Sequence, residues 1–163
     1  MTGQTTAAKR RLEDLVHRYS MLVYRHCYVL LGQAQDAQDA VQETFLRYWK
    51  TAPDLRDENH ERAWLLTVAT NLCRNRHRDK SRHPQVPLDS LPEQADPLSE
   101  ENSLMEALVQ LPAPYKRVVL LHYIHGYKVR EIAAMEHLTS SAVKMRLKKA
   151  RDLLYDIYKE DVL

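Results

Sequence analysis

Apolar residues recur three and four positions apart along most of the chain, which places them on one face of a helix. In the first half, this pattern predicts three helices. The first covers residues 7–31 and stops at Gly32, because glycine tolerates the left-handed conformation that ends many helices. The second begins where Asp36 can cap it. After a loop from Thr51 to Asn59, the third runs into a basic tail that ends near Arg82.

The pattern then breaks in a polar, acidic segment. Four prolines interrupt residues 83–100, and such a stretch buries too little apolar surface to offset the entropy lost on ordering. Helical spacing resumes afterwards. The expected helices are a short one over residues 104–111, one that starts near Pro114 and stops at Gly126, and two more at 129–136 and 139–158.

We therefore predict an all-α fold of two small helical domains, residues 1–82 and 104–163, joined by a flexible Pro-rich acidic linker over residues 83–103. Composition agrees, since the chain has only 3 glycines and 1 Phe and is poor in strand formers. The formal net charge is +2, but it divides into +3 over residues 1–80, −4 over residues 81–103 and +3 over residues 104–163. Two basic ends therefore flank an acidic middle.

The two cysteines, Cys27 and Cys73, fall in apolar helical stretches. We interpret them as buried reduced thiols, which fits a reducing compartment. Apolar stretches are far shorter than the roughly 20 residues that span a bilayer. The sequence thus predicts a cytoplasmic protein with no direct membrane insertion.

The segment from Lys128 to Arg151 is typical of a helix, a short turn and a basic second helix. Thr139 can cap the second helix, which places Ser140 and Ser141 at its exposed start, where a recognition helix meets base edges in the major groove. Lysines and arginines further along suit phosphates or guanines. The alternative is a solvated basic helix in an ordinary bundle. The residues that supply this charge are Lys144, Arg146, Lys148, Lys149 and Arg151.

A second basic feature lies at the end of the third helix. Asn71, Asn75 and Arg78 share one helical face, with Arg74 and Arg76 nearby. Trp64 lies upstream on the same helix, and an aromatic ring beside cations suits unstacked single-stranded bases. The alternative is a charged helix end beside a linker, with Trp64 in the core.

The sequence contains no motif that indicates a catalytic site. A glycine-rich phosphate loop is excluded because the only glycines are Gly3, Gly32 and Gly126, and no serine lies in a nucleophile-elbow pattern. His122 and His125 lack the acid and third ligand of a zinc site. We predict no catalytic residue, no cofactor and no metal.

Several runs resemble bacterial RNA polymerase sigma factors, specifically the extracytoplasmic-function (ECF) type of the sigma-70 family. Residues 36–49 (DAQDAVQETFLRYW) resemble the family's core-binding helix, and residues 63–71 (AWLLTVATN) with the arginine-rich sequence after them resemble its promoter-melting segment. The runs at 111–126, 131–133 and 143–151 resemble its −35-reading domain. The order and spacing match over both predicted domains.

The resemblance implies three sets of contacts. The helix that would dock on the clamp of core RNA polymerase carries Asp39, Gln42, Glu43, Phe45, Leu46 and Trp49. The opened −10 element would meet Trp64, Asn71, Arg74, Asn75, Arg76 and Arg78, and the loop from Leu55 to Glu61 would hold a flipped-out base. The −35 duplex would meet Ser140, Ser141, Lys144, Arg146, Lys148 and Lys149. Further implied partners are the polymerase flap and an anti-sigma factor.

The sequence departs from the family at the turn before the recognition helix. Glu136 and His137 stand where the family often has Leu-Gly, so we expect loss of an apolar contact and a strained backbone at a position that favours glycine. Two other hypotheses remain at this point. A helix-turn-helix regulator that binds duplex DNA alone would have no need of residues 39–49, and an interaction adaptor would have no need of a basic recognition helix.

Overall fold

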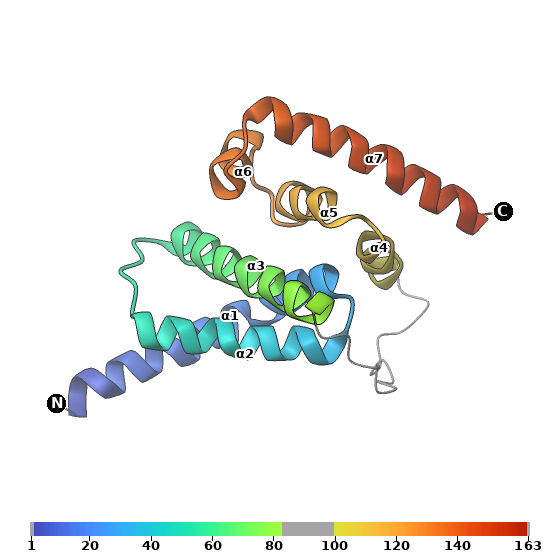
Figure 1. Ribbon diagram of the computed structural model, residues 1–163. Coiled ribbons are helices and arrows are strands. Elements are labelled where there is room, and N and C mark those ends of the chain that lie inside the picture. The colour runs from blue at the N-terminus through green and yellow to red at the C-terminus, as the bar shows by residue number, and fades with distance from the viewer. Residues whose placement is uncertain (1, 83–99, 163) are drawn as a thin grey trace. The chain divides into compact units, whose positions relative to one another are not determined.

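All regular structure in the described part of the chain is helical, as predicted (Figure 1). The computed structural model describes the backbone of residues 2–82 and 100–162 and the side chains of residues 3–76 and 103–159. The chain divides into two units, Met1–Pro92 and Glu93–Leu163. Most of the predicted linker, residues 83–103, lies outside the described residues.

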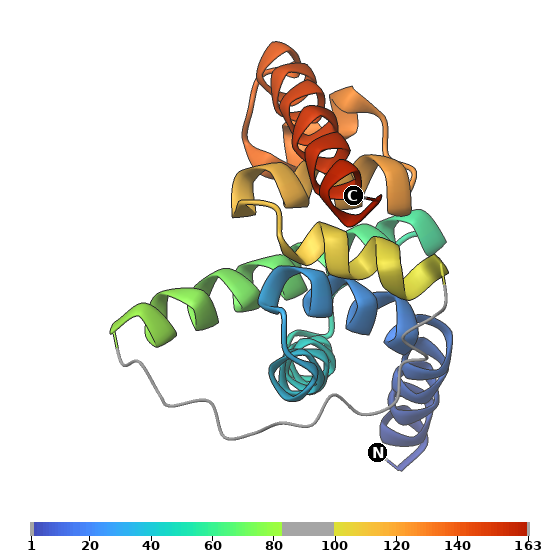
Figure 2. The same cartoon turned by 90° about the vertical axis from the view of Figure 1, so that its right-hand side faces the viewer.

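The first unit contains three helices, α1 (Thr2–Leu31), α2 (Ala34–Thr51) and α3 (Glu58–Arg82). Each packs against the other two (Figures 1 and 2). Their core is fully enclosed, and burying each large apolar side chain stabilises the unit by roughly 1.5–3 kcal/mol. The most deeply buried apolar side chains are Val23, Cys27 and Val29 of α1, Ala37 and Ala40 of α2, and Leu65, Leu66, Ala69 and Cys73 of α3.

One polar contact crosses this core. His26 Nε2 lies 2.8 Å from Thr70 Oγ1, and both side chains are buried. Because the Thr70 hydroxyl donates to the Leu66 carbonyl at 2.7 Å, it accepts from His26, whose Nε2 must carry the proton. The contact thus joins α1 to α3 at a fixed register.

The two cysteines are buried free thiols, as predicted. A hydrogen bond with Cys73, together with burial, raises the pKa of Cys27. The Cys27 thiol therefore stays protonated and unreactive inside the core.

The turn between α1 and α2 confirms one predicted boundary and corrects another. Gly32 has φ 77° and its N–H donates to Tyr28 O at 2.7 Å, so it ends α1 as expected. The prediction that Asp36 caps the next helix was wrong, because α2 begins at Ala34 with Gln33 at the cap position. Asp36 lies in the first turn, where a carboxylate is favoured by the helix dipole and reaches an arginine of α3.

The second unit contains α4 (Glu100–Val109), α5 (Ala113–Val119), a π-helical turn η1 (Leu120–Ile124), α6 (Val129–Glu136) and α7 (Ser140–Val162). Two of these helices are longer than predicted, since α4 begins about one turn before Leu104 and α7 continues beyond Tyr158. Helix α7 packs against α4, α5 and α6. The side chains that fill this core include Leu108, Val118, Leu120, Ile132, Val143 and Ala150.

The turn between α6 and α7 accommodates the two unusual residues in different ways. His137 takes the left-handed conformation, with φ 56° and ψ 44°, which is the position where glycine was expected. Glu136 has a side chain only 6% exposed and accepts a hydrogen bond from Arg117 Nε at 3.0 Å. An ion pair between α5 and α6 therefore replaces the apolar contact that the sequence lacks.

We expect glycine to relieve the strain at this turn. His137→Gly should raise the free energy of unfolding of the second unit by about 0.5–1 kcal/mol, because a non-glycine side chain is disfavoured at positive φ. Gly126→Ala is the matched control with the opposite sign, since Gly126 has φ 77° and no atom lies within 4 Å of an added Cβ. It should lower the same free energy by about 1 kcal/mol.

Urea unfolding followed by two probes checks both values. Both tryptophans, Trp49 and Trp64, lie in the first unit, so tryptophan fluorescence reports only on that unit, whereas circular dichroism reports on both. Each substitution should move the dichroism transition and leave the fluorescence transition in place. An unchanged dichroism transition for His137→Gly would show that the turn carries no strain.

Candidate nucleic-acid interface

Helix α3 has one buried face and one solvent-exposed face, which we call the open face. Leu65, Leu66, Ala69 and Cys73 are buried, whereas Asn71, Arg74 and Asn75 are exposed. With 3.6 residues per turn, Asn71 and Asn75 lie on the side opposite the buried residues. The side chain of Arg78, the third member of the predicted face, lies outside the described residues. The described part of the face exposes two amides and a guanidinium as hydrogen-bonding groups.

Trp64 lies on the same side of α3 as Asn71 but is only half-buried. Its ring meets the ring of Tyr48 on α2 edge to face, with centroids 5.9 Å apart and planes at 80°. That geometry is favourable for aromatic pairs and fixes the orientation of the indole. Trp64 is thus both a packing residue and a border of the open face.

Arg76 points to the margin between α3 and α2. Its Nη1 lies 3.5 Å from Asp36 Oδ1 and 3.7 Å from Asp39 Oδ2. The Asp39 carboxylate also accepts a hydrogen bond from Gln35 at 3.1 Å. The structure therefore joins a residue predicted to meet DNA, Arg76, to one predicted to meet polymerase, Asp39.

The predicted polymerase-binding residues of α2 separate into a surface group and a buried support. Gln42 is exposed, and Leu46 and Trp49 are unusually open for apolar side chains, at 49% and 41%. Phe45 is buried, at 6%, so it anchors the helix and does not reach the surface. Exposed apolar side chains within reach of one another along a helix are typical of an interaction surface.

The start of α7 also has an open polar face. Thr139 Oγ1 accepts from Ala142 N–H at 3.1 Å, so Thr139 caps α7 as predicted. All but one of the predicted residues are exposed, and Ser140, Ser141, Lys144 and Lys148 share one side of the helix. Arg146 is half-buried and points away from Lys144, while Lys149 is exposed on a third side.

Arg151, another cation of the recognition helix, has a partner within the unit. Its Nη1 donates to the Tyr123 hydroxyl at 2.9 Å. This bond ties α7 to η1. The side chain is therefore engaged in holding α7 in place.

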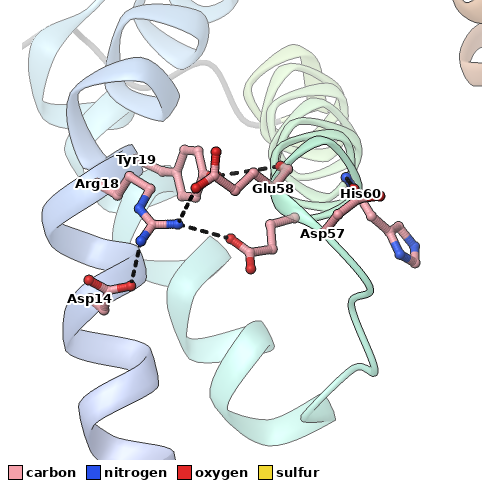
Figure 3. Close-up of polar contacts among 7 residues, drawn as sticks. Asp14, Arg18, Tyr19, Asp57, Glu58 and His60 are labelled. Carbon is pink, nitrogen blue, oxygen red and sulfur yellow. Dashed lines mark hydrogen bonds and ion pairs between the residues drawn. The ribbon is translucent and has the colours of Figure 1, made fainter.

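The sequence interpretation missed Arg18 and Tyr19 of α1, which contact the first turn of α3 beside the loop between α2 and α3 (Figure 3). The spacing of four between Asp14 and Arg18 was a visible signal for a helical ion pair. The other partner, Glu58, is 40 positions away, and a contact at that separation cannot be found by periodicity.

Family models match both units. A model of sigma-70 region 2 matches residues 15–83, and a model of sigma-70 region 4 matches residues 101–154. ECF RNA polymerase sigma factor SigW of Bacillus subtilis is 28% identical over 159 residues, which cover 86% of this chain and 85% of that protein. ECF RNA polymerase sigma factor SigL of Mycobacterium tuberculosis is 28% identical over 156 residues, with 90% and 88% covered.

Solved structures show the same fold. CnrH, in complex with the cytosolic domain of CnrY, superposes with a TM-score of 0.67 at 25% identity and covers 96% of this chain and 95% of its own. The sigma factor RpoE from Bartonella quintana, in complex with the anti-sigma factor NepR, has a TM-score of 0.71 at 20% identity, with 92% and 98% covered.

The chain belongs to the sigma-70 family of RNA polymerase sigma factors, within the ECF group. It therefore directs core RNA polymerase to promoters, and this family is not generally enzymatic. A separate regulator or an adaptor does not account for a match to both regions. Within the described residues, no helix is long and apolar enough to cross a membrane.

The ion pair between α3 and α2 generates a prediction for stability. In a double-mutant cycle, Asp36→Asn and Arg76→Met should couple by about 0.5–1 kcal/mol in the free energy of unfolding, because Arg76 Nη1 lies 3.5 Å from Asp36 Oδ1 and the Asp36 side chain is only 15% exposed. Glu43→Gln with Arg47→Met is the matched control, since that pair is 3.9 Å long with side chains 44% and 54% exposed. Its coupling should be near zero.

Tryptophan fluorescence during urea unfolding measures both cycles, because both pairs lie in the first unit with Trp49 and Trp64. Absence of coupling between Asp36 and Arg76 would contradict a stabilising ion pair between α2 and α3.

Proposed function

We propose that this sigma factor divides promoter recognition between its two units. The open face of α3 captures bases of the unpaired −10 strand, and the start of α7 reads the −35 duplex. One observation carries the proposal: Asn71 and Asn75 are exposed directly opposite a sealed apolar face, so α3 cannot turn them inward. The proposed domain boundaries remain residues 1–82 and 104–163.

The proposed −10 face suits single strands better than duplex DNA. Asn71 and Asn75 offer both donors and acceptors, which bind base edges once these are unpaired. Arg74 supplies positive charge for the backbone, and Trp64 borders the same side with an aromatic ring. Capture of unstacked bases shifts the equilibrium from closed to open DNA. Binding alone can therefore assist melting, without nucleotide hydrolysis.

The proposed −35 face fits the major groove. Side chains at the N-terminal end of a recognition helix reach base edges, and those further along meet phosphates. The N-terminal end of α7, which would reach base edges, carries Ser140, Ser141 and Lys144. Lys148 follows one turn later on the same side of the helix. Because Arg146 points to another side, we assign it a place at the flank of the groove.

We propose that α2 docks on the polymerase clamp through Gln42, Glu43, Leu46 and Trp49, with Asp39 at the edge of this surface and Phe45 as its anchor. The second unit would meet the flap. The complexes of RpoE with NepR and of CnrH with CnrY support an anti-sigma factor as a further partner. We infer that the chain works in the cytoplasm, where core polymerase and DNA are found, as a binding subunit without catalysis of its own.

The docking surface is tested by charge reversal. Gln42→Lys with Glu43→Lys should weaken core binding at least tenfold, since two new cations desolvate poorly in an interface built around apolar contacts. Glu13→Lys with His17→Lys changes the net charge equally, with His neutral, at exposed sites of α1 outside the proposed surface and should leave core affinity near the wild type. Fluorescence anisotropy with purified core polymerase measures both.

Equal affinities for the two double variants, with normal helicity in each, would contradict the docking surface on α2.

The recognition helix is tested by a promoter library. Lys144→Ala should change which −35 sequences are used, because a lost base contact removes roughly 1–3 kcal/mol of discrimination. Lys149→Ala should weaken all −35-dependent promoters similarly and reduce the salt dependence by about one phosphate contact. Holoenzyme transcription across the library at two salt concentrations distinguishes these outcomes. An unchanged rank order for Lys144→Ala would show that this end of α7 does not enter the groove.

A further inference from the structure

The loop between α2 and α3, Ala52–Asp57, is folded back onto the first turn of α3. Asp57 Oδ1 accepts from the His60 backbone N–H at 2.8 Å, which caps the helix. The Arg56 backbone N–H in turn donates to His60 Nδ1 at 3.2 Å. The position of the end of the loop is therefore set by the position of this turn.

Two neighbouring residues of α1 hold the same turn (Figure 3). Arg18 reaches Asp14 Oδ2 with Nη2 at 3.0 Å, and its Nη1 lies 3.3 Å from Glu58 Oε1. The Tyr19 hydroxyl donates to the Glu58 backbone carbonyl at 3.4 Å. Burial raises the pKa of Tyr19, so the hydroxyl remains a donor. Both the side chain and the backbone of Glu58 are thus tied to α1.

Arg18 also lies close to the carboxylate of Glu61 and offsets its negative charge. Glu61 is 23% exposed, and its Oε2 has no hydrogen-bond partner among the described residues. Arg18 Nη1 lies 3.7 Å from this oxygen. A shielded carboxylate next to a strand of phosphates would repel it unless a cation lies close by.

These ion pairs contribute little to folding. The side chains of Arg18 and Glu58 are 42% and 78% exposed, and pairs this open are weak in water. The cluster instead places a positive charge, Arg18, beside Glu58 and Glu61 in the first turn of α3. This turn follows the loop that would receive a base.

We propose that Arg18 is a positioning residue for −10 recognition. It holds the first turn of α3, and through it the loop Ala52–Asp57, in the geometry that receives an unpaired base. It also compensates Glu58 and Glu61, which would otherwise repel the strand. The inference rests on the proposed capture of the −10 strand by the first unit.

The test uses holoenzyme assembled from core polymerase and the full chain. The probe is a fluorescent set of single-stranded oligonucleotides that carry non-template −10 sequences. Arg18→Met should weaken their binding by about three- to tenfold at low salt and by less at high salt, because exposed charges are screened. Arg10→Met, an exposed arginine of the same helix, is the matched control and should bind as the wild type does.

Two further variants separate positioning from folding. Adding Glu58→Gln and Glu61→Gln to Arg18→Met should restore part of the lost affinity, which a merely structural defect would not allow. Arg18→Lys should be intermediate, because a lysine keeps the charge but cannot bridge Asp14 and Glu58 in the same planar way. Core affinity and the thermal midpoint should be the same for Arg18→Met and Arg10→Met.

The inference is overturned if Arg18→Met binds the oligonucleotides as Arg10→Met does while Leu55→Ala, within the loop, weakens binding. It is also overturned if Arg18→Met lowers core affinity and strand affinity equally, or if the glutamate substitutions restore nothing. If Leu55→Ala and the Arg18 variants all bind normally while Asn71→Ala weakens binding, the inference is overturned and the proposed capture by the face of α3 stands. If Asn71→Ala also binds normally, the proposed capture of the −10 strand fails as well.

Discussion

Burial of one face of α3 against α1 is the interaction on which the first unit depends. The buried contact between His26 and Thr70, 2.8 Å long, lies within an otherwise apolar seam that includes Val23, Leu66 and Ala69. A shift of α3 by one residue would turn it by about 100°, leave a buried imidazole unpaired and expose leucines to water. The direction of Asn71 and Asn75 is therefore fixed by what lies behind them.

The charged contacts around this seam are weak individually but lie where the interfaces are expected. Arg76 links α3 to α2 through Asp36 and Asp39, and Arg18 links α3 to α1 through Glu58. Both pairs are partly open to solvent, so their strength depends on the ionic strength. The second unit is built differently, since α7 is capped by Thr139 and anchored through its own buried residues Val143 and Leu147. The end of α7 that we propose for duplex DNA is therefore held by apolar packing.

Elements with a strong period were predictable, because burial of one helical face dictates the spacing of apolar residues. The stop at Gly32, the cap at Thr139 and the bounds of α6 all follow from local chemistry. Long-range contacts were not predictable. Which helices meet decides the link of Arg76 to Asp39 and the contacts of Arg18 with Glu58. The start of α2 before Asp36 was also missed. At Glu136, the sequence predicts that an apolar contact is missing from the turn. It does not reveal that Arg117, 19 positions earlier, pairs with the carboxylate.

In the proposed function, the open face of α3 acts on unpaired bases. Permanganate reactivity of −10 thymines, measured beside initial promoter binding with holoenzyme that carries Asn71→Ala, tests it most directly. Open complexes should fall by roughly tenfold or more, with a much smaller loss of initial binding, since stacking and base-edge contacts arise only after unpairing. Equal losses of initial binding and opening would contradict it, because Asn71 would then only position the duplex.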